Sequence, residues 1–410
     1  MIQKYETPFL EKAYAWLLLL IPVLSQYRYG ALDLDVVLMV VFFLVYLLRK
    51  PRLYITPIGK QVFLLLLYMV GITVANIFFG RLFSTTSDII VRAGKYGLYL
   101  LIVFFMGNEL LTYKSLMRIY RYIAFAATIY IIIQAVAYYG AGITLPHMIG
   151  GSSHAAETDV GRLRSFYSEP AAMAYAMTPF VICSLFGEKY HDGRFGKLFD
   201  ALFVSIGVVI STSGQGIVAI GVAWTMWLIL RMIRGEIKKA KELLLIISLL
   251  LAIALLYQSG ILKFALGRVE NTSEGSALDA RMSGYETLSL LGDFQRIFGA
   301  GYGNYVVENV YGLNVFFDVV NYSSIAQFLF TLGIAGTLAW ALFFVATFLK
   351  GTTCSRVLIT IMLMMSFGGC PMLVTFFPIW LTLICLQLPP GLFSHRSLVE
   401  SKQNGKGLSR

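Results

Sequence analysis

Long apolar runs recur along the chain, and most are separated by short polar segments. Many contain about 20 residues, the length that lets a helix cross a bilayer while satisfying its own backbone hydrogen bonds. The pattern predicts an all-α polytopic membrane protein with about twelve transmembrane helices. The predicted spans are residues 10–27, 32–48, 61–79, 88–107, 119–140, 170–187, 198–212, 214–233, 243–260, 322–349, 357–369 and 371–388.

Three of these spans, 198–212, 357–369 and 371–388, are short or closely spaced, so eleven spans would also fit. We expect residues 1–391 to form a single transmembrane domain. Residues 392–410 are polar and basic, a composition that predicts a disordered tail.

Lysine and arginine predict the orientation of the spans. With the N-terminus inside, the cytoplasmic segments carry about three times as many basic residues as the external segments. The bias places both termini and the tail in the cytoplasm. The first span is not expected to be a cleaved signal peptide, because Glu6 and Glu11 dilute the positive charge before it.

Composition excludes several classes of protein. Hydrophobic residues make up 58% of the chain and charged residues 13%, which is unlike a soluble globular protein. The net charge of +11 falls in short gaps between spans, so a nucleic-acid-binding surface is not expected. The four cysteines have no CxxC or Cys/His spacing and predict neither a metal site nor a disulfide framework.

Two external segments are much longer than the other connections, about 141–169 and about 261–321. Neither is rich in proline or low in complexity, and long loops in compact proteins are usually functional or disordered. We therefore expect the chemistry of the protein to lie in these two loops.

The first loop ends in RLRSFYSEP, residues 162–170, directly before a predicted span. Pro170 suits the first position of a helix, and Ser168 or Glu169 suits the cap, where a side-chain oxygen accepts a free N–H. Glu169 would then lie at the outer mouth of the helix below Arg162 and Arg164. A capping carboxylate with two solvated arginines is an equally good interpretation of Glu169.

In the second loop, residues 276–294 predict an amphipathic helix that Gly292 ends. Arg281 would lie at the edge of its apolar face, directed toward the protein, although a snorkelling arginine would look the same. Arg268 and Arg296 lie in the same loop. All but one of the external basic residues are arginine, whose guanidinium grips phosphate oxygens with two parallel hydrogen bonds.

Arg92 and Lys95 lie within the span 88–107, close to its outer end. Intramembrane cations usually face a cavity or an anion, although both could instead snorkel to the surface. If the two external loops converge above this span, they form an electropositive cavity for a lipid-linked phosphate or pyrophosphate.

Other polar segments are weaker candidates. The segment FGAGYGN, residues 298–304, follows no strand and predicts a tight turn and not a nucleotide fingerprint. The segment STSGQG, residues 211–216, predicts a tight turn small enough to let a head group approach. His147 and His154 could supply a base, but Glu169 is the better candidate.

Three segments carry a resemblance to a known family. They are RSFYSEP at 164–170, RIFGAGYGN at 296–304 and NYSSIAQFLFTLGIAG at 321–336. In this order and placement they resemble the Wzy-type O-antigen and capsule polymerases and the related O-antigen ligases. In the ligases the last motif begins with a histidine, whereas this chain has Tyr322 at that position, which favours a polymerase.

The resemblance implies a GT-C-like membrane glycosyltransferase at the outer face of the bacterial cytoplasmic membrane. It would join oligosaccharide repeat units carried by undecaprenyl pyrophosphate, with no metal or other cofactor, and a chain-length regulator and a flippase would be its partners. By this resemblance Arg164 and Arg281 would hold the pyrophosphate. The residues themselves, and not the resemblance, suggest Glu169 as the base. Further candidates for substrate binding come from the resemblance or from the argument about positive charge at the outer face. They are Arg162, Arg268, Arg296, Arg92, Lys95 and Tyr322.

The chemistry needs no protein nucleophile, because the acceptor hydroxyl attacks the anomeric carbon and the diphosphate leaves. Arginines can stabilise the departing charge and a carboxylate can take the proton. An inverting single displacement is our hypothesis. An O-antigen ligase, a flippase or transporter for a lipid-linked sugar, and a non-catalytic scaffold are the alternatives.

Overall fold

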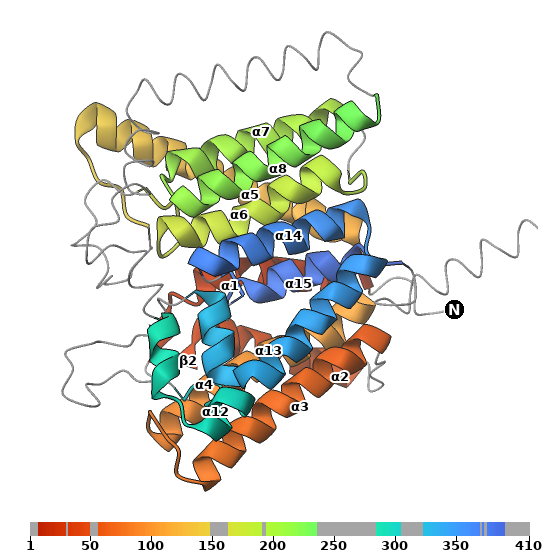
Figure 1. The fold of residues 1–410 in the computed structure, drawn as a ribbon. Coiled ribbons are helices and arrows are strands. Elements are labelled where there is room, and N and C mark those ends of the chain that lie inside the picture. Colours follow the sequence, from red (N-terminus) through yellow and green to blue (C-terminus); the bar gives the residue numbers. More distant parts are fainter. Residues whose placement is uncertain are drawn as a thin grey trace, which may run out of the picture. The chain divides into compact units, whose positions relative to one another are not determined.

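A computed structural model describes residues 7–29, 32–49, 56–147, 163–190, 194–235, 284–304, 323–369, 371–372 and 375–389. These residues form helices joined by turns, together with one short antiparallel ladder (Figure 1). The ladder pairs β1 (Arg28–Tyr29) with β2 (Leu32–Asp33). The predicted all-α architecture is confirmed for this part of the chain.

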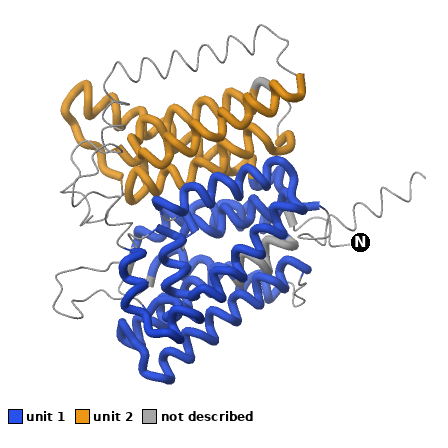
Figure 2. Tube along the Cα trace, in the orientation of Figure 1, with its two compact units in different colours: residues 1–116, 277–410 blue, residues 117–276 orange. Residues whose placement is uncertain are grey.

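The contacts group the chain into two compact units, which Figure 2 colours separately. Unit 1 contains residues 1–116 and 277–410, and unit 2 contains residues 117–276. The helices of unit 1 are α1 (Thr7–Leu24), α2 (Leu34–Arg49), α3 (Pro57–Phe78), α4 (Thr86–Leu110), α12 (Asp293–Phe298), α13 (Ser324–Lys350), α14 (Thr353–Gly368) and α15 (Phe377–Leu386), with a 3₁₀ turn, η1 (Thr287–Leu290). Unit 2 contains most of α5 (Tyr113–Ala141), and α6 (Pro170–Phe186), α7 (Arg194–Ile210) and α8 (Gly214–Ile233).

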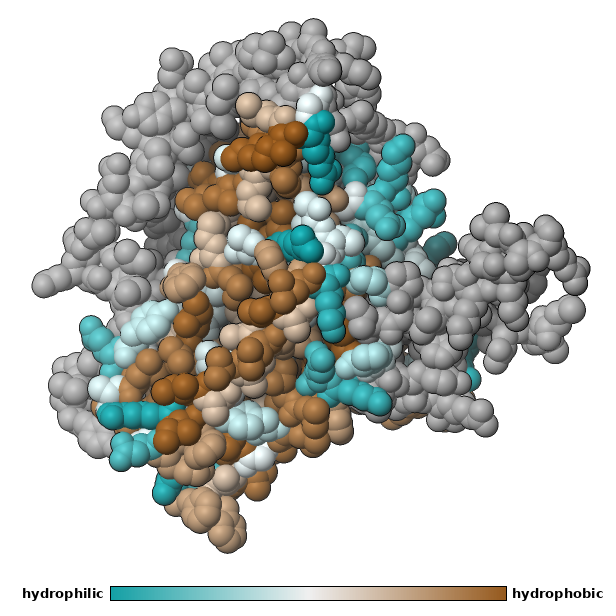
Figure 3. Space-filling model, turned by 45° about the vertical axis from the view of Figure 1, so that its right-hand side comes forward, coloured by the Kyte–Doolittle hydropathy of each residue, from teal (hydrophilic) through white to brown (hydrophobic). Residues whose placement is uncertain are grey.

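Each predicted span that reaches the described residues overlaps a helix, although α15 covers only residues 377–386 of the predicted span 371–388. The predicted span 243–260 lies outside the described residues. Four helices, α3, α5, α8 and α13, are long and apolar enough to cross a membrane. Their large apolar side chains are often exposed, as at Leu64, Val136 and Leu338, and Figure 3 shows an extensive apolar surface on the face it draws. Such a surface is typical of contact with lipid. The apolar helices therefore indicate a membrane protein.

Local sequence explains where several helices begin. Pro57 occupies the first turn of α3, and the hydroxyl of Thr56 accepts a hydrogen bond from the N–H of Gly59. Ser323 caps α13 in the same way, by accepting from the N–H of Ala326. Proline and a capping hydroxyl both favour a helix start, because the first N–H groups have no partner inside the helix.

Helix α6 is the core of unit 2. Its residues from Pro170 to Leu185 are all buried, and it packs on α7 and α8. The hydroxyl of Tyr120 in α5 donates to the carbonyl of Ala176. Near the other end of α6, Arg121 of α5 forms an ion pair with the buried Asp200 of α7, with Nε and Oδ2 3.0 Å apart.

In unit 1, helix α13 is interrupted at Gly333, which has a φ of 64°. A break in an apolar helix frees carbonyl groups that need new donors. The N–H groups of Ala300 and Gly301 donate to the carbonyls of Phe330 and Thr331, both at 2.9 Å. The hydroxyl of Tyr68 in α3 donates to the carbonyl of Leu332 at 3.1 Å. The predicted FGAGYGN turn therefore supplies backbone donors to the carbonyl groups that the break in α13 frees.

Close packing explains the glycine at the start of this turn. Gly299 has a φ of 99°, and a Cβ atom there would lie 2.3 Å from the carbonyl oxygen of Thr331. Its own carbonyl accepts from the side-chain amide of Asn76 at 3.0 Å. Two of the segments that carry the family resemblance, RIFGAGYGN and the described part of NYSSIAQFLFTLGIAG, thus pack directly on each other.

Candidate functional site

The RSFYSEP segment forms a turn that is anchored on α5. Ser165 has a φ of 56°, a left-handed conformation that is uncommon for a residue other than glycine. The side-chain amide of Gln134 accepts from the N–H of Ser165 at 2.8 Å and donates to its carbonyl at 3.1 Å. The hydroxyl of Ser165 donates to the carbonyl of Ala127 at 2.9 Å. These bonds hold the turn in a conformation that it would rarely adopt alone.

Arg164 lies at the mouth of α6 and is only 8% exposed. Its Nη1 atom donates to the carbonyl of Ser168 at 2.8 Å. His147, beyond the end of α5, lies close enough to Arg164 for the two side chains to interact electrostatically. Burial and the positive charge of Arg164 both lower the pKa of His147 below its ordinary value. A guanidinium charge is therefore held where sequence analysis predicted an anion-binding group.

Glu169 is the N-cap residue of α6 and Pro170 is the first helical residue, as predicted. The prediction that the Glu169 carboxylate accepts a hydrogen bond from a helix N–H is wrong, because this side chain makes no capping bond. The carboxylate is exposed instead. It is therefore accessible as a proton acceptor at the same end of α6 as Arg164.

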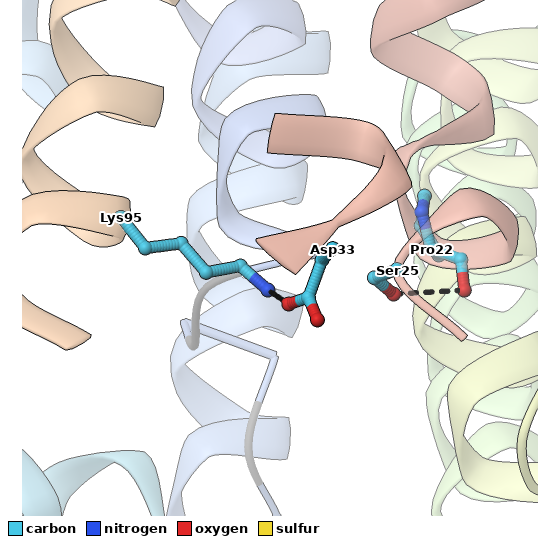
Figure 4. Close-up of polar contacts among 4 residues, drawn as sticks. All are labelled: Pro22, Ser25, Asp33 and Lys95. Carbon is cyan, nitrogen blue, oxygen red and sulfur yellow. Dashed lines mark hydrogen bonds and ion pairs between the residues drawn. The ribbon is translucent and has the colours of Figure 1, made fainter. Parts of the chain in front are cut away.

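Lys95 and Arg92 lie in unit 1, on α4. The Lys95 ammonium is paired with the carboxylate of Asp33, at the end of β2 (Figure 4). The side chains of Lys95 and Asp33 are 18% and 10% exposed, so their charges are largely withdrawn from solvent. Asp35 follows in the first turn of α2 and is fully buried. Lys95 thus lies beside two carboxylates, which weakens its attraction for an anionic substrate.

Arg296 is exposed on α12, where it donates to the carbonyl of Ser289 at 3.2 Å. The predicted amphipathic helix is described only from residue 284 onward. Its helical turns end at Leu290, and Gly292 caps the start of α12. In this part, Tyr285 and Leu288 pack against a buried apolar cluster. The cluster consists of Leu291, Ala300, Ala326 and Phe330.

Several predicted site residues lie outside the described part of the chain. They are Arg162, Arg268, Arg281, Tyr322 and His154. The meeting of Arg164 with Arg281 therefore stays a prediction. Sequence analysis missed Gln134, because nothing in a long apolar helix indicates which distant turn its amide will hold.

No family model matches this chain, and no curated protein matches it.

Proposed function

We propose that this protein is a polysaccharide polymerase of the bacterial cytoplasmic membrane, with about twelve spans and a GT-C-like fold. It joins oligosaccharide repeat units carried by undecaprenyl pyrophosphate, at the outer face of the membrane. Both termini are cytoplasmic, and a chain-length regulator and a flippase are its partners. The resemblance of three segments to the O-antigen polymerases supports this proposal, together with the charge bias of the loops.

The observation that carries the proposal is the mouth of α6. A nearly buried arginine and an exposed carboxylate lie within one turn that strong hydrogen bonds anchor on α5. A buried guanidinium attracts phosphate oxygens more strongly than a solvated one, because water screens it less. The exposed carboxylate is free to accept a proton from a sugar hydroxyl.

This arrangement supports the following reaction. A hydroxyl of the acceptor sugar attacks the anomeric carbon of the donor, and its proton passes to Glu169. The bond between that carbon and the diphosphate oxygen breaks, and Arg164 stabilises the charge on the leaving diphosphate. One glycosidic bond forms, and undecaprenyl pyrophosphate is released. Arg281, Arg268, Arg162 and Arg296 belong to the same proposal as further phosphate ligands.

The test uses the purified full chain in nanodiscs with a defined lipid-linked repeat unit, and the product is a ladder of longer glycans. Arg164→Lys keeps the charge but loses the paired hydrogen bonds, so we expect elongation to slow about tenfold or more. Glu169→Gln removes the base and should slow it about a hundredfold. Arg118→Lys, an exposed exchange on α5, is the matched control.

The same assay separates the alternatives. A flippase changes the sidedness of the lipid-linked sugar but makes no longer product. A ligase moves the glycan to a separate acceptor and makes no ladder from the repeat unit alone. A scaffold shows no turnover. Wild-type elongation by both Arg164→Lys and Glu169→Gln would overturn the assignment of the site.

A further inference from the structure

A buried carboxylate at the start of α2 takes no part in the proposed reaction. Asp35 lies in the first turn of this helix and is fully buried. Neither of its carboxylate oxygens has a hydrogen-bond partner among the described residues. The N–H groups of Asp35 and Val36 lie near the carboxylate without bonding to it. Such a carboxylate is costly as an anion, because it has lost its hydration and gained no partner.

The charges nearest to Asp35 are those of Lys95 and Asp33, because Asp35 interacts electrostatically with both side chains. The Lys95 ammonium is bound to Asp33 and not to Asp35 (Figure 4). Arg28, a second basic residue, is the neighbour of Asp33 across the short ladder. Among the described residues, Asp35 is therefore the carboxylate of this region that has no cation of its own.

The other titratable groups near the start of α2 do not supply a partner either. Helices α1 and α4 pack on α2. In α1, Glu11 accepts hydrogen bonds from the turn before α5, and Tyr14 interacts with Tyr46, three turns along α2 from Asp35. In α4, the ring of Tyr99 lies 5.8 Å from the Lys95 Nζ atom. Arg92, also on α4, lies against the turn at Gly303.

A buried carboxylate of this kind is neutralised by a proton or by a bound cation. A metal ion needs several oxygen ligands. The described surroundings of Asp35 offer only one further carboxylate, that of Asp33, together with an ammonium that repels a second cation. A proton needs a single oxygen. The geometry therefore favours a proton on Asp35 over a metal ion.

We propose that Asp35 is a proton-binding site inside unit 1 and that the Lys95 ammonium moves from Asp33 to Asp35 when the proton leaves. The O–H bond of the Asp35 carboxyl breaks, the proton passes to solvent, and the ammonium takes its place beside the carboxylate. Asp33 keeps its negative charge throughout. Proton binding is thus coupled to the position of the only charge that α4 places on α2 among the described residues. This inference needs no glycan or diphosphate, so it stands apart from the proposed function.

Infrared difference spectroscopy tests the proton site directly. The full chain carries isotope-labelled aspartate and is held in a maltoside detergent, which has no ester carbonyl. Spectra at pH about 6 and about 9 are compared, because ordinary aspartates are ionised throughout this range. We expect a carboxyl band from aspartate that is present at the lower pH and lost at the higher. Asp35→Asn should abolish it, whereas Asp88→Asn, at an exposed acid in the first turn of α4, should not.

Asp33→Asn tests the movement of Lys95. Asparagine keeps the shape of the side chain but cannot hold the ammonium by charge, so Lys95 should pair with Asp35 at both pH values. The carboxyl band should then vanish although Asp35 itself is unchanged. A proton on Asp35 that is not coupled to Lys95 would leave the band in place. Asp35→Asn removes a buried charge without a partner, so its melting temperature should equal or exceed that of the wild type.

Loss of the band in both Asp35→Asn and Asp33→Asn supports the proposal. Absence of the band from the wild type, or its survival in Asp35→Asn, overturns the proton site. A band of equal strength at both pH values overturns the exchange of the proton, and its survival in Asp33→Asn overturns the movement of Lys95. Sodium or potassium chloride in place of choline chloride should not change the band at the lower pH. Its loss in either salt would show that a metal ion occupies the site, and the assignment to a proton would fail.

Discussion

The break in α13 and the start of α6 both expose backbone groups in an apolar protein, but the two regions treat these groups differently. At the break, the carbonyls of Phe330, Thr331 and Leu332 each receive a donor from the chain itself. At the start of α6, the N–H groups of Ala171 and Ala172 receive no acceptor among the described residues. Carbonyl groups that all receive donors indicate a structural role, whereas buried N–H groups without an acceptor indicate a place for a ligand.

The largest expected effect is at the satisfied region. Gly299→Ala would place a Cβ atom 2.3 Å from the carbonyl oxygen of Thr331 and would impose a strained φ. Overpacking and strain together should lower the free energy of unfolding by about 4 kcal/mol. Titration with a denaturing detergent would measure it.

Gly71→Ala in α3 is the matched control for this substitution, because a Cβ atom there meets nothing within 4 Å. It should be neutral or should stabilise the helix by about 1 kcal/mol at most. Equal stability of the two variants would mean that the turn at Gly299 does not close the break in α13.

The Lys95 and Asp33 pair offers the next largest effect. Lys95→Met leaves the carboxylates of Asp33 and Asp35 buried without their cation, and we expect a loss of roughly 3 kcal/mol in the free energy of unfolding. The double variant with Asp33→Asn should recover part of that loss. If the double variant also bound pyrophosphate more weakly than the wild type, Lys95 would be a substrate ligand and not only a structural cation.

The anchor of the RSFYSEP turn should have a smaller effect on stability. Gln134→Met removes two hydrogen bonds to Ser165 and should lower the free energy of unfolding by about 2 kcal/mol. It should also slow glycan elongation, because Arg164 and Glu169 are then less well held. Ile129→Met, on an exposed part of α5, should change neither quantity. Normal elongation by the Gln134 variant would remove the turn from the proposed mechanism.

The smallest effect concerns the protonation of His147. Because burial and Arg164 lower its pKa, the folded protein binds this proton less readily than the unfolded chain. The resulting stability is present above the ordinary pKa of histidine and is lost as the pH falls through the lowered value. Arg164→Gln should raise the pKa of His147, measured from its NMR chemical shift, and Arg118→Gln should not. An unchanged pKa after Arg164→Gln would show that the arginine charge does not reach the histidine.

Local chemistry allowed several features to be predicted directly. The helix ranges follow from apolar runs, because a backbone in an apolar environment must satisfy its own hydrogen bonds. The start of α6 at Pro170 with Glu169 as cap follows from the fixed φ and missing N–H of proline. The tight turn after α12 follows from its glycines, and the predicted turn 211–216 is confirmed at residues 211–213, whereas Gly214–Gly216 begin α8.

Contacts between distant residues could not be predicted in this way. The two bonds from Gln134 to Ser165 join residues 31 positions apart, and the pair of Lys95 with Asp33 joins residues 62 positions apart. Neither partner has a local pattern that identifies the other. The uncapped state of Glu169 was also missed, because the residue type favours a capping bond and only the surrounding turn decides whether it forms.

The amino-acid sequence alone determined that this chain forms apolar helices with a charge bias that predicts their orientation, since these properties depend on neighbouring residues and on the solvent. Tertiary structure alone decided which polar groups are satisfied. The turn at Gly299 closes the break in α13, while α6 begins with open donors, because both outcomes depend on how helices far apart in sequence pack against each other.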